Sequence, residues 1–335
     1  MTVIVTGGAG FIGSNLIRGL NARGVTDIWV IDNLGSSLKF KNLIGCKFSQ
    51  YLQKDHFREL VRGKQFDFEV SAIFHQGACS NTMELDGNYM IDNNYQYSVE
   101  LLDFATEREV PFIYASSAAV YGSNTQFKED SVNESPLNVY GYSKLIFDEL
   151  VRGRLHKAKS QIIGLRYFNV YGPREGHKGQ MASVSYHLTQ QMFEGGALRL
   201  FEGSGGYASG DQRRDFIYVD DIVKVNLDFL DHPDRSGIYN CGTGQSQTFN
   251  EVAVATINSF REKLGDKTLT LDQMLSEEIV TYRPFPDGLE SRYQSFTEAD
   301  LTSLKASGCD VEFLDVNSGI KAYVDFLSQT NSYKS

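Results

Sequence analysis

The sequence predicts an α/β fold, in which a doubly wound parallel sheet is joined to a smaller, interwoven α/β domain. Short apolar runs rich in branched side chains alternate with helical segments, which is typical of a parallel sheet covered on both faces. The length of 335 residues exceeds that of one average domain. None of the six prolines marks a linker, so we expect the chain to cross between the domains more than once. We place the sheet domain at 1–170 and about 215–245, and the smaller domain at about 171–214 and 246–330.

The N-terminal segment has the pattern of a strand, a turn, a helix and a second strand. Val3–Val5 is a short run with the composition of a strand buried on both faces, and the glycine-rich stretch Thr6–Gly13 follows it directly. Apolar residues then recur at helical spacing over Ser14–Leu20. Ile28–Ile31 is the next strand, and it ends at Asp32.

This pattern predicts a dinucleotide site in a Rossmann-type domain. The glycines of Thr6–Gly13 allow a tight turn and the close approach of a pyrophosphate to a helix N-terminus. Asp32 follows at the distance where a carboxylate binds a ribose hydroxyl. Asp32 alone favours NAD, whereas Lys39 and Lys54 offer partners for the 2′-phosphate of NADP, so both cofactors stay open.

The sheet continues in three further strand candidates, Ala72–His75, Phe112–Ala115 and Ile162–Tyr167. Two helical segments lie between them, at Tyr95–Glu107 and Ser143–Arg154. Each strand is followed by small or polar residues. Because ligands of such sheets bind at the carboxyl ends of the strands, we expect the chemistry at these positions.

Tyr140 and Lys144 lie one helical turn apart and therefore share a face. A neighbouring ammonium favours a phenolate, which would make the tyrosine a usable base near neutral pH. A tyrosine and a lysine at this spacing are often only a packed phenol beside a solvated amine. The catalytic interpretation needs a hydride carrier and a third catalytic group. A serine at the end of the strand, Ser116 or Ser117, can be this third group, because its hydroxyl can donate to a developing alkoxide.

Two later basic features are candidates for further roles. Lys178 lies in the glycine-rich run Gly172–Gly179, where it could be a second proton-handling group, a phosphate ligand or a surface lysine. A second base would separate an epimerase from an ordinary dehydrogenase. Arg213 and Arg214 bring two guanidinium groups to one point, which suits a diphosphate, although a solvated charge cluster is the alternative.

The composition disfavours several classes of function. The chain has 32 basic and 42 acidic residues and a net charge of −10, which disfavours nucleic acid and anionic membranes as partners. No apolar run approaches a membrane span, and the start of the chain has the pattern of a strand, not of a signal peptide. The cysteines show no metal-ligand spacing, so we expect no metal site and reduced thiols in a cytoplasmic protein. They are Cys46, Cys79, Cys241 and Cys309.

Over nearly its whole length the chain resembles the extended short-chain dehydrogenase/reductase family. Within it, the chain is most similar to the ADP-glyceromanno-heptose 6-epimerases of lipopolysaccharide core synthesis. The glycine and Tyr-x-x-x-Lys motifs indicate the wider family, whereas Arg166–Val184 and Arg292–Gln294 are specific to the heptose epimerases. The other segments that carry the resemblance are Thr6–Gly13, His75–Ser80, Asp92–Ser98, Tyr114–Gly122, Pro136–Lys144, Phe201–Ser204 and Arg214–Asp221.

The resemblance implies a reaction and a set of catalytic residues. The C6 hydroxyl of ADP-D-glycero-β-D-manno-heptose would be oxidised to a ketone by tightly bound NADP, with NAD possible, and hydride would return to the opposite face. The triad would be Ser117, Tyr140 and Lys144, with Ser117 in register in preference to Ser116. Lys178 would act as the second acid/base. The resemblance also implies a homo-oligomer, a pentamer.

The resemblance further implies the ligand contacts. His187 could equally be a core histidine. Expected cofactor-binding residues are Gly7, Gly10, Phe11, Ile12, Gly13, Asp32, Asn33, Lys39, Lys54, Gln76, Gly77, Ala78, Cys79, Ser80, Asn93, Lys144, Val170 and Lys178. Expected substrate-binding residues are Ser117, Asn169, Gln180, His187, Phe201, Glu202, Gly203, Ser204, Arg214 and Tyr293.

Some positions depart from the heptose epimerases. Gln76 stands where they carry glutamate, and the stretches Gly205–Gln212 and Arg261–Tyr282 are longer, which leaves the nucleotide and the sugar open. A sugar-nucleotide 4,6-dehydratase is disfavoured because Ala118 and Ala119 occupy the place of its acid. A non-catalytic dinucleotide-binding protein is disfavoured because the triad is intact.

Overall fold

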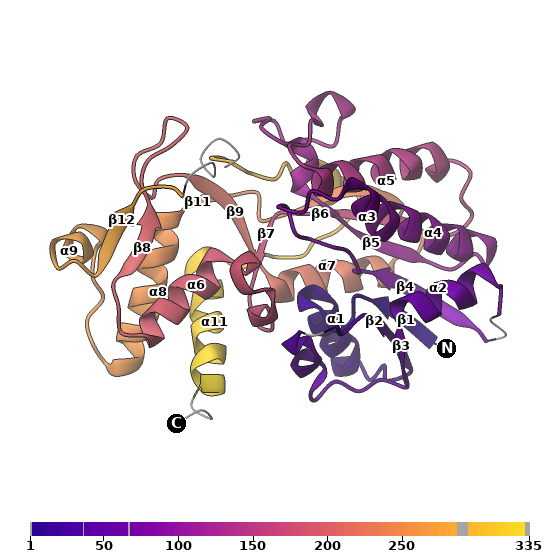
Figure 1. The fold of residues 1–335 in the computed structure, drawn as a ribbon, viewed down its shortest axis with the longest axis horizontal. Helices are drawn as coiled ribbons and strands as arrows, with labels where there is room; N and C mark the ends of the chain where they lie inside the picture. The colour runs from indigo at the N-terminus through magenta and orange to yellow at the C-terminus, as the bar shows by residue number, and fades with distance from the viewer. Residues whose placement is uncertain (1, 36, 66–67, 287–293, 332–335) are drawn as a thin grey trace. The chain divides into compact units, whose positions relative to one another are not determined.

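The computed structural model describes residues 2–35, 37–65, 68–286 and 294–331. The chain forms two compact units, and it passes from one to the other several times (Figure 1). The first unit consists of Met1–Tyr167, Ile222–Cys241 and Asp300–Val311. The second consists of Phe168–Asp221, Gly242–Ala299 and Glu312–Ser335.

The first unit is built on a seven-stranded sheet in the order β10-β6-β5-β4-β1-β2-β3. All of its strand pairs are parallel, so the predicted doubly wound parallel sheet is confirmed. The strand order reverses at β1, which pairs with β2 on one side and β4 on the other, and this is the switch point where such sheets bind ligands. The strands are β1 (Thr2–Thr6), β2 (Ile28–Asp32), β3 (Gln50–Gln53), β4 (Val70–His75), β5 (Phe112–Ser117), β6 (Ile162–Tyr167) and β10 (Gly237–Cys241).

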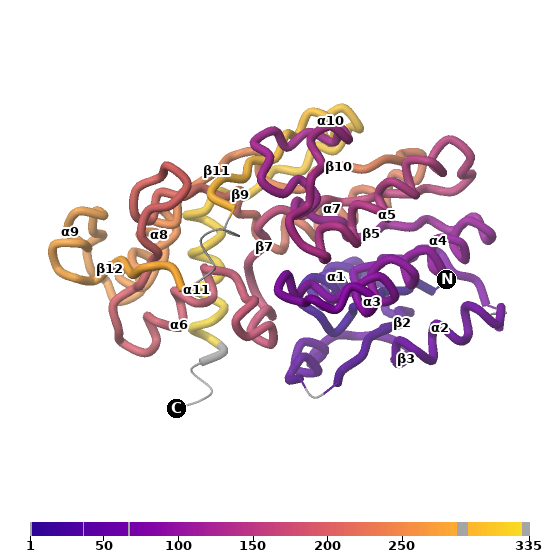
Figure 2. The backbone as a smooth tube through the Cα atoms, turned by 45° about the horizontal axis from the view of Figure 1, so that its top comes forward, coloured from indigo at the N-terminus to yellow at the C-terminus, as the bar shows by residue number. Residues whose placement is uncertain are grey.

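Helices cover both faces of this sheet. The main ones are α1 (Phe11–Ala22), α2 (Lys54–Arg62), α4 (Tyr97–Glu107), α5 (Val139–Leu155) and α7 (Val219–Asp231). Shorter ones are η1 (Leu38–Leu43), α3 (Gly87–Met90), η2 (Ile91–Gln96), η3 (Ala118–Tyr121), η4 (Ser131–Asn133) and α10 (Thr302–Ala306). Figure 2 shows α10, near the end of the chain, beside β10.

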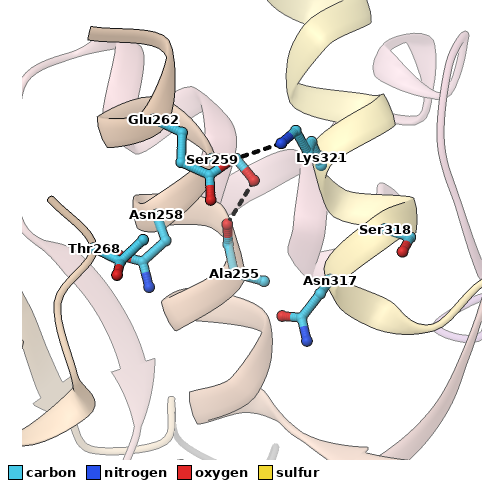
Figure 3. Close-up of a pocket in the computed structure, with 8 residues that line it drawn as sticks. All are labelled: Ala255, Asn258, Ser259, Glu262, Thr268, Asn317, Ser318 and Lys321. Atoms are coloured by element: carbon cyan, nitrogen blue, oxygen red, sulfur yellow. Dashed lines mark hydrogen bonds and ion pairs between the residues drawn. The ribbon is translucent and has the colours of Figure 1, made fainter. Parts of the chain in front are cut away.

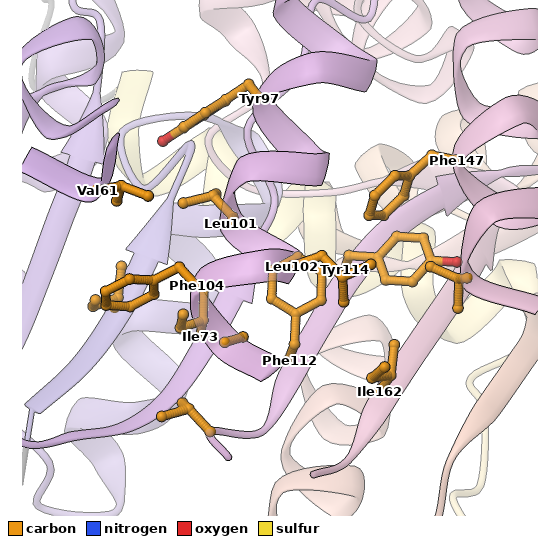
Figure 4. Packing of buried hydrophobic residues seen from close by; sticks show 14 of the residues in the cluster. Val61, Ile73, Tyr97, Leu101, Leu102, Phe104, Phe112, Tyr114, Phe147 and Ile162 are labelled. Atoms are coloured by element: carbon orange, nitrogen blue, oxygen red, sulfur yellow. The ribbon is translucent and has the colours of Figure 1, made fainter. Parts of the chain in front are cut away.

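The core of the first unit lies between the sheet and the helices α2, α4 and α5 (Figure 4). Val61, Leu101 and Phe147 pack from these helices against strand residues such as Ile73 and Phe112. Full burial of a side chain of this size contributes about 1.5–3 kcal/mol. The apolar runs that predicted the strands are therefore also what holds the helices in place.

Two predicted helices begin elsewhere than expected. The helix predicted from Ser143 begins earlier, at Val139, because the Asn138 side chain caps it by accepting from the Gly141 N–H at 2.8 Å. The α-helix predicted from Tyr95 begins at Tyr97, because the residues before it form the π-helical turn η2. Such turns often occur at functional positions within helices.

The second unit contains a three-stranded sheet, β11-β9-β7, and a two-stranded sheet, β12-β8. Helices α6, α8 and α11 share an apolar core with these strands. The strands are β7 (Asn169–Tyr171), β8 (Leu198–Phe201), β9 (Arg213–Tyr218), β11 (Ser246–Thr248) and β12 (Val280–Arg283). The helices are η5 (Gly176–Met181), α6 (Val184–Phe193), α8 (Phe249–Leu264), α9 (Leu271–Ser276) and α11 (Val316–Asn331). Across the described ranges, no helix is long and apolar enough to cross a membrane.

Candidate functional site

The glycine-rich turn after β1 forms a bare backbone cradle. Gly7 has a φ of +65°, and a Cβ atom on Gly13 would lie 2.2 Å from the Gly7 carbonyl oxygen. Gly10 is the N-cap of α1, and it makes no side-chain cap hydrogen bond to the start of the helix. A Cβ on Gly7 would also lie 2.7 Å from Gly77 Cα, so the loops after β1 and β4 touch at the switch point. Such a cradle suits a pyrophosphate.

Asp32 connects the second strand to this cradle. Its side chain is buried, and Oδ2 accepts from the Ala9 N–H at 2.9 Å. Its other oxygen, Oδ1, forms an ion pair with Lys39 Nζ at 2.5 Å. Lys54 Nζ donates to Asn93 Oδ1 at 2.8 Å. The structure therefore places Asp32, the predicted acid, against the glycine turn, and Lys39 forms an ion pair with it.

Ser117 and Tyr140 come together at the end of β5. A hydrogen bond with the Ser117 hydroxyl lowers the pKa of the Tyr140 phenol, but burial raises that pKa more, so the net shift is upward. Ser117 Oγ also accepts from the Ala119 N–H at 3.1 Å. Ser116 lies on the opposite face of the strand, as alternation requires, and donates to Asp148 Oδ2 at 2.8 Å. Of the two candidate serines, the structure brings Ser117 to the tyrosine.

Lys144 is almost completely buried beneath the same strand end. Its ammonium donates to the Ala115 carbonyl oxygen at 2.7 Å. Burial lowers the pKa of Lys144 to about 8, although the negative charge of Asp148 acts in the other direction. Burial therefore brings the pKa of this lysine much closer to neutral pH than that of an exposed lysine.

Asn94, which the sequence analysis did not single out, links the cofactor loop to the helix of Tyr140. In the π-helical turn η2, its Oδ1 accepts from the Cys79 N–H at 2.8 Å. Its Nδ2 donates to Ser143 Oγ at 3.1 Å, and Ser143 Oγ donates to the Tyr140 carbonyl at 2.7 Å. The only sequence signal was the Asp-Asn-Asn run, which was noted for its resemblance and for Asn93.

The remaining predicted cofactor residues of the first unit lie at two loops and one helix turn. Phe11, Ile12 and Gly13 begin α1, and Asn33 follows β2. Gln76, Gly77, Ala78, Cys79 and Ser80 form the loop after β4, where Gln76 Oε1 accepts from the Tyr167 hydroxyl at 3.0 Å.

The second unit holds the other predicted residues. Val170 lies on β7 beside Asn169, whose Oδ1 accepts from Thr297 Oγ1 at 3.2 Å. Lys178 and Gln180 lie in η5, and burial lowers the pKa of Lys178 while the charge of Glu175 opposes that shift. Tyr293 lies outside the described residues.

The guanidinium groups of Arg213 and Arg214 do not lie at one point, contrary to the expectation from the sequence. Arg213 and Arg214 are adjacent on β9 and therefore point to opposite faces. Arg213 Nη2 donates to the Ser246 carbonyl at 2.6 Å, whereas Arg214 is buried on the other face. The two guanidinium groups therefore do not meet at one point.

The last group of expected substrate residues is divided between a helix and a loop. His187 lies half-buried on α6, with its ring 5.8 Å from that of Tyr186. Phe201 ends β8, and Glu202, Gly203 and Ser204 follow it. Gln212 Nε2 fixes this loop by donating to the Glu202 carbonyl at 2.7 Å and to Ser204 Oγ at 3.1 Å.

A polar pocket between α8 and α11 contains none of these residues (Figure 3). Its wall includes the ion pair of Glu262 with Lys321 at 2.7 Å and the Ser259 hydroxyl, which donates to the Ala255 carbonyl. Within the described ranges, no group of three or more His, Cys, Asp or Glu side chains is placed to hold a metal ion.

Comparison with known families identifies one that matches more than half of the chain. The family described as the NAD dependent epimerase/dehydratase family matches residues 3–242. The chain belongs to this family. The match covers the glycine turn, the strand ends and the Tyr-x-x-x-Lys helix, and it extends into the second unit through Lys178 and Arg214.

Solved structures of epimerases match the chain over almost its whole length. The ADP-L-glycero-D-manno-heptose-6-epimerase of Helicobacter pylori is 33% identical, with a TM-score of 0.79, covering 98% of this chain and 96% of that one. The UDP-glucose 4-epimerase of Thermotoga maritima, solved with UDP-glucose, is 26% identical, with a TM-score of 0.78 and coverage of 98% and 99%. The UDP-glucose 4-epimerase of Thermus thermophilus, in complex with NAD, is 25% identical, with a TM-score of 0.74 and coverage of 98% and 99%.

Proposed function

We propose that this protein epimerises C6 of the heptose in ADP-D-glycero-β-D-manno-heptose, giving ADP-L-glycero-β-D-manno-heptose for the lipopolysaccharide inner core. The observation that carries the proposal is the 33% identity to the Helicobacter pylori heptose epimerase across 98% of this chain. The alternative is another nucleotide-sugar epimerase, since a UDP-glucose 4-epimerase is 26% identical. The longer stretch Gly205–Gln212 lies in the unit to which we assign the substrate.

We propose NADP as the cofactor, with NAD as the alternative, and assign it to the first unit. The residues fit a dinucleotide, because the glycine turn leaves the backbone bare where a Cβ would fill the cradle. Asp32 and Lys39 would meet the adenosine ribose, with Lys39 and Lys54 as the cations for a 2′-phosphate. When bound, the dinucleotide accepts a hydride from the substrate and returns it.

The protein's own side chains supply the proton chemistry. Tyr140 removes the proton of the C6 hydroxyl or returns it, and Ser117 donates to the oxygen on which charge develops. We assign the ammonium of Lys144 to the stabilisation of the phenolate, which the burial of Tyr140 opposes. Lys178 is the acid/base for the opposite face of the carbon, and burial has already lowered its pKa. If it is instead a phosphate ligand, replacing it should raise KM and leave kcat unchanged.

The substrate contacts are assigned to the second unit, apart from Ser117. Arg214 is the proposed diphosphate ligand. We further propose a cytoplasmic homo-oligomer, a pentamer by resemblance. The other proposed contacts are Asn169, Gln180, His187, Phe201, Glu202, Gly203, Ser204 and Tyr293.

Incubation of the purified protein with ADP-D-glycero-D-manno-heptose should convert it to the L-glycero epimer. The C6 configuration is followed by NMR, and UDP-glucose is tested in parallel under the same conditions. Because hydride leaves and returns to the same carbon, we expect no net oxidation of the sugar. Turnover of UDP-glucose without any turnover of the heptose would contradict the heptose assignment and favour the UDP-hexose alternative.

Replacing Lys39 by methionine should weaken NADP binding by about 10- to 100-fold relative to NAD. A charged hydrogen bond contributes about 1.5–3 kcal/mol, and the substitution also leaves the Asp32 carboxylate without the cation 2.5 Å away. The dissociation constants of both dinucleotides are measured by titration calorimetry on protein freed of bound nucleotide. Lys41→Met, at an exposed position two residues further on, is the matched control and should change neither constant. Equal losses for NADP and NAD would contradict a 2′-phosphate contact.

A further inference from the structure

Glu175 is a buried carboxylate to which the proposed mechanism gives no role. It lies in the segment between β7 and α6, three residues before Lys178, and none of its surface is exposed. An ionised carboxylate out of water costs several kcal/mol unless donors compensate it. A residue of this kind in a surface segment requires a specific set of partners.

Those partners stand at the two ends of the loop that carries Lys178. Glu175 Oε1 accepts from the Gly172 N–H at 3.1 Å and from Ser183 Oγ at 2.7 Å. Oε2 accepts from the Ser183 N–H at 2.6 Å. Ser183 is also the N-cap of α6, since its hydroxyl accepts from the Tyr186 N–H at 3.2 Å. One carboxylate therefore fixes both the start and the end of the loop from Gly172 to Ser183.

The backbone within this loop needs such a closure. Arg174 has a φ of +76°, a left-handed conformation that is strained for a non-glycine residue and persists only where the surroundings hold it. Gly179, on the other side of Lys178, has a φ of +55°. The Lys178 N–H donates to the Glu175 carbonyl oxygen at 2.9 Å, so the lysine backbone is tied to the same residue.

Glu175 also sets the charge around Lys178. Its carboxylate favours the protonated ammonium, whereas burial favours the neutral amine. The other titratable groups of the loop are Arg174 and His177. Phenols face Glu175 from two further elements, Tyr186 from α6 and Tyr323 from α11, and burial together with the charge of Glu175 raises the pKa of both, so they stay neutral.

We propose that Glu175 is the positioning residue for Lys178: its carboxylate closes the loop from Gly172 to Ser183, and its negative charge favours the ammonium form of the lysine. The significance for catalysis rests on the proposed function, in which Lys178 is the second acid/base. The placement of the carboxylate is independent of that role, so the two can be tested separately.

Glu175→Gln is the primary test, because it preserves the shape, removes the charge and turns an amide N–H₂ toward donors. The first measurement is the pH dependence of acetylation of Lys178 by acetic anhydride, read by mass spectrometry without substrate. We expect its midpoint at lower pH than in the wild type. Net epimerisation should fall about 100-fold, mainly in kcat, as for a catalytic group displaced by about 1 Å. An unchanged midpoint in folded E175Q protein would overturn the proposal.

The controls separate charge, position and catalytic role. Glu194→Gln makes the same charge change at an exposed position at the end of α6 and should shift neither measurement. Glu175→Asp keeps the charge and shortens the reach, so kcat should fall about tenfold with the midpoint still above that of E175Q. If circular dichroism shows that the E175Q protein is unfolded, Glu175→Asp becomes the primary test. A kcat of Glu175→Asp equal to that of the wild type would then overturn the positioning role. Lys178→Met with unchanged kcat and raised KM would refute the second base of the proposed function and leave the acetylation result intact.

Discussion

Replacing Tyr140 by phenylalanine should reduce net epimerisation by about 100- to 10,000-fold, the usual contribution of a positioned general acid/base. The substitution removes only the hydroxyl that bonds with Ser117, and the ring remains to fill the same space. Retention of the dinucleotide should be unchanged. Turnover is measured by NMR at C6 of the heptose, and bound nucleotide is measured after denaturation of the purified variant.

The matched control lies on the same helix. Tyr142→Phe removes a hydroxyl two residues further on, where 51% of the side chain is exposed, and should leave turnover within about twofold of the wild type. A Tyr140→Phe variant with turnover within tenfold of the wild type would contradict the role of the phenol as the first base. If Tyr140→Phe also lost its dinucleotide, the loss of turnover would report binding, and the base assignment would fail this test.

The parallel sheet could be predicted because its central strands are buried on both faces. Ile162–Tyr167 is apolar except at Gly164 and Arg166, and it was predicted with its observed bounds. The edge strand β3 was missed because Gln50–Gln53 is polar and half-exposed, and an edge strand needs only one neighbour to form. The pattern of apolar residues in the sequence indicates buried strands. Whether a segment such as β3 forms a strand depends instead on its pairing with a neighbouring strand.

The candidate site could be predicted only where a motif is local in sequence. Tyr140 and Lys144 lie one helical turn apart, so their common helix follows from spacing. The residues alone leave Ser116 and Ser117 open, and the resemblance favours Ser117. The alternation along β5, which sends Ser116 toward Asp148, gives the physical reason. The Glu175 closure depends on backbone groups, Gly172 N–H and Ser183 N–H, which carry no sequence signature.

Arg166→Met should destabilise the first unit by about 3–5 kcal/mol, because it leaves the buried Asp148 carboxylate without its cation and removes one of the two arginine partners of Glu134, the other being Arg152. The guanidinium is fully buried on β6, where Nε donates to Asp148 Oδ2 at 2.9 Å and Nη2 pairs with Glu134 Oε1 at 2.5 Å. Urea unfolding is followed by the fluorescence of Trp29, the single tryptophan of the chain, which lies on β2 in the same unit.

The loss of stability in Arg166→Met should depend on the planar, forked geometry of the guanidinium as well as on its charge. Arg166→Lys keeps the positive charge, but an ammonium cannot bond both carboxylates as the guanidinium does. The free energy of unfolding of this variant should therefore lie between those of the wild type and Arg166→Met. Arg23→Met removes an exposed ion pair with Asp231 and should cost no more than about 1 kcal/mol. An Arg166→Met midpoint equal to that of Arg23→Met would show that the buried carboxylates are protonated or rearranged. Because Asp148 also accepts from Ser116, next to Ser117, loss of the arginine should lower turnover even in urea-free buffer where the unit is still folded.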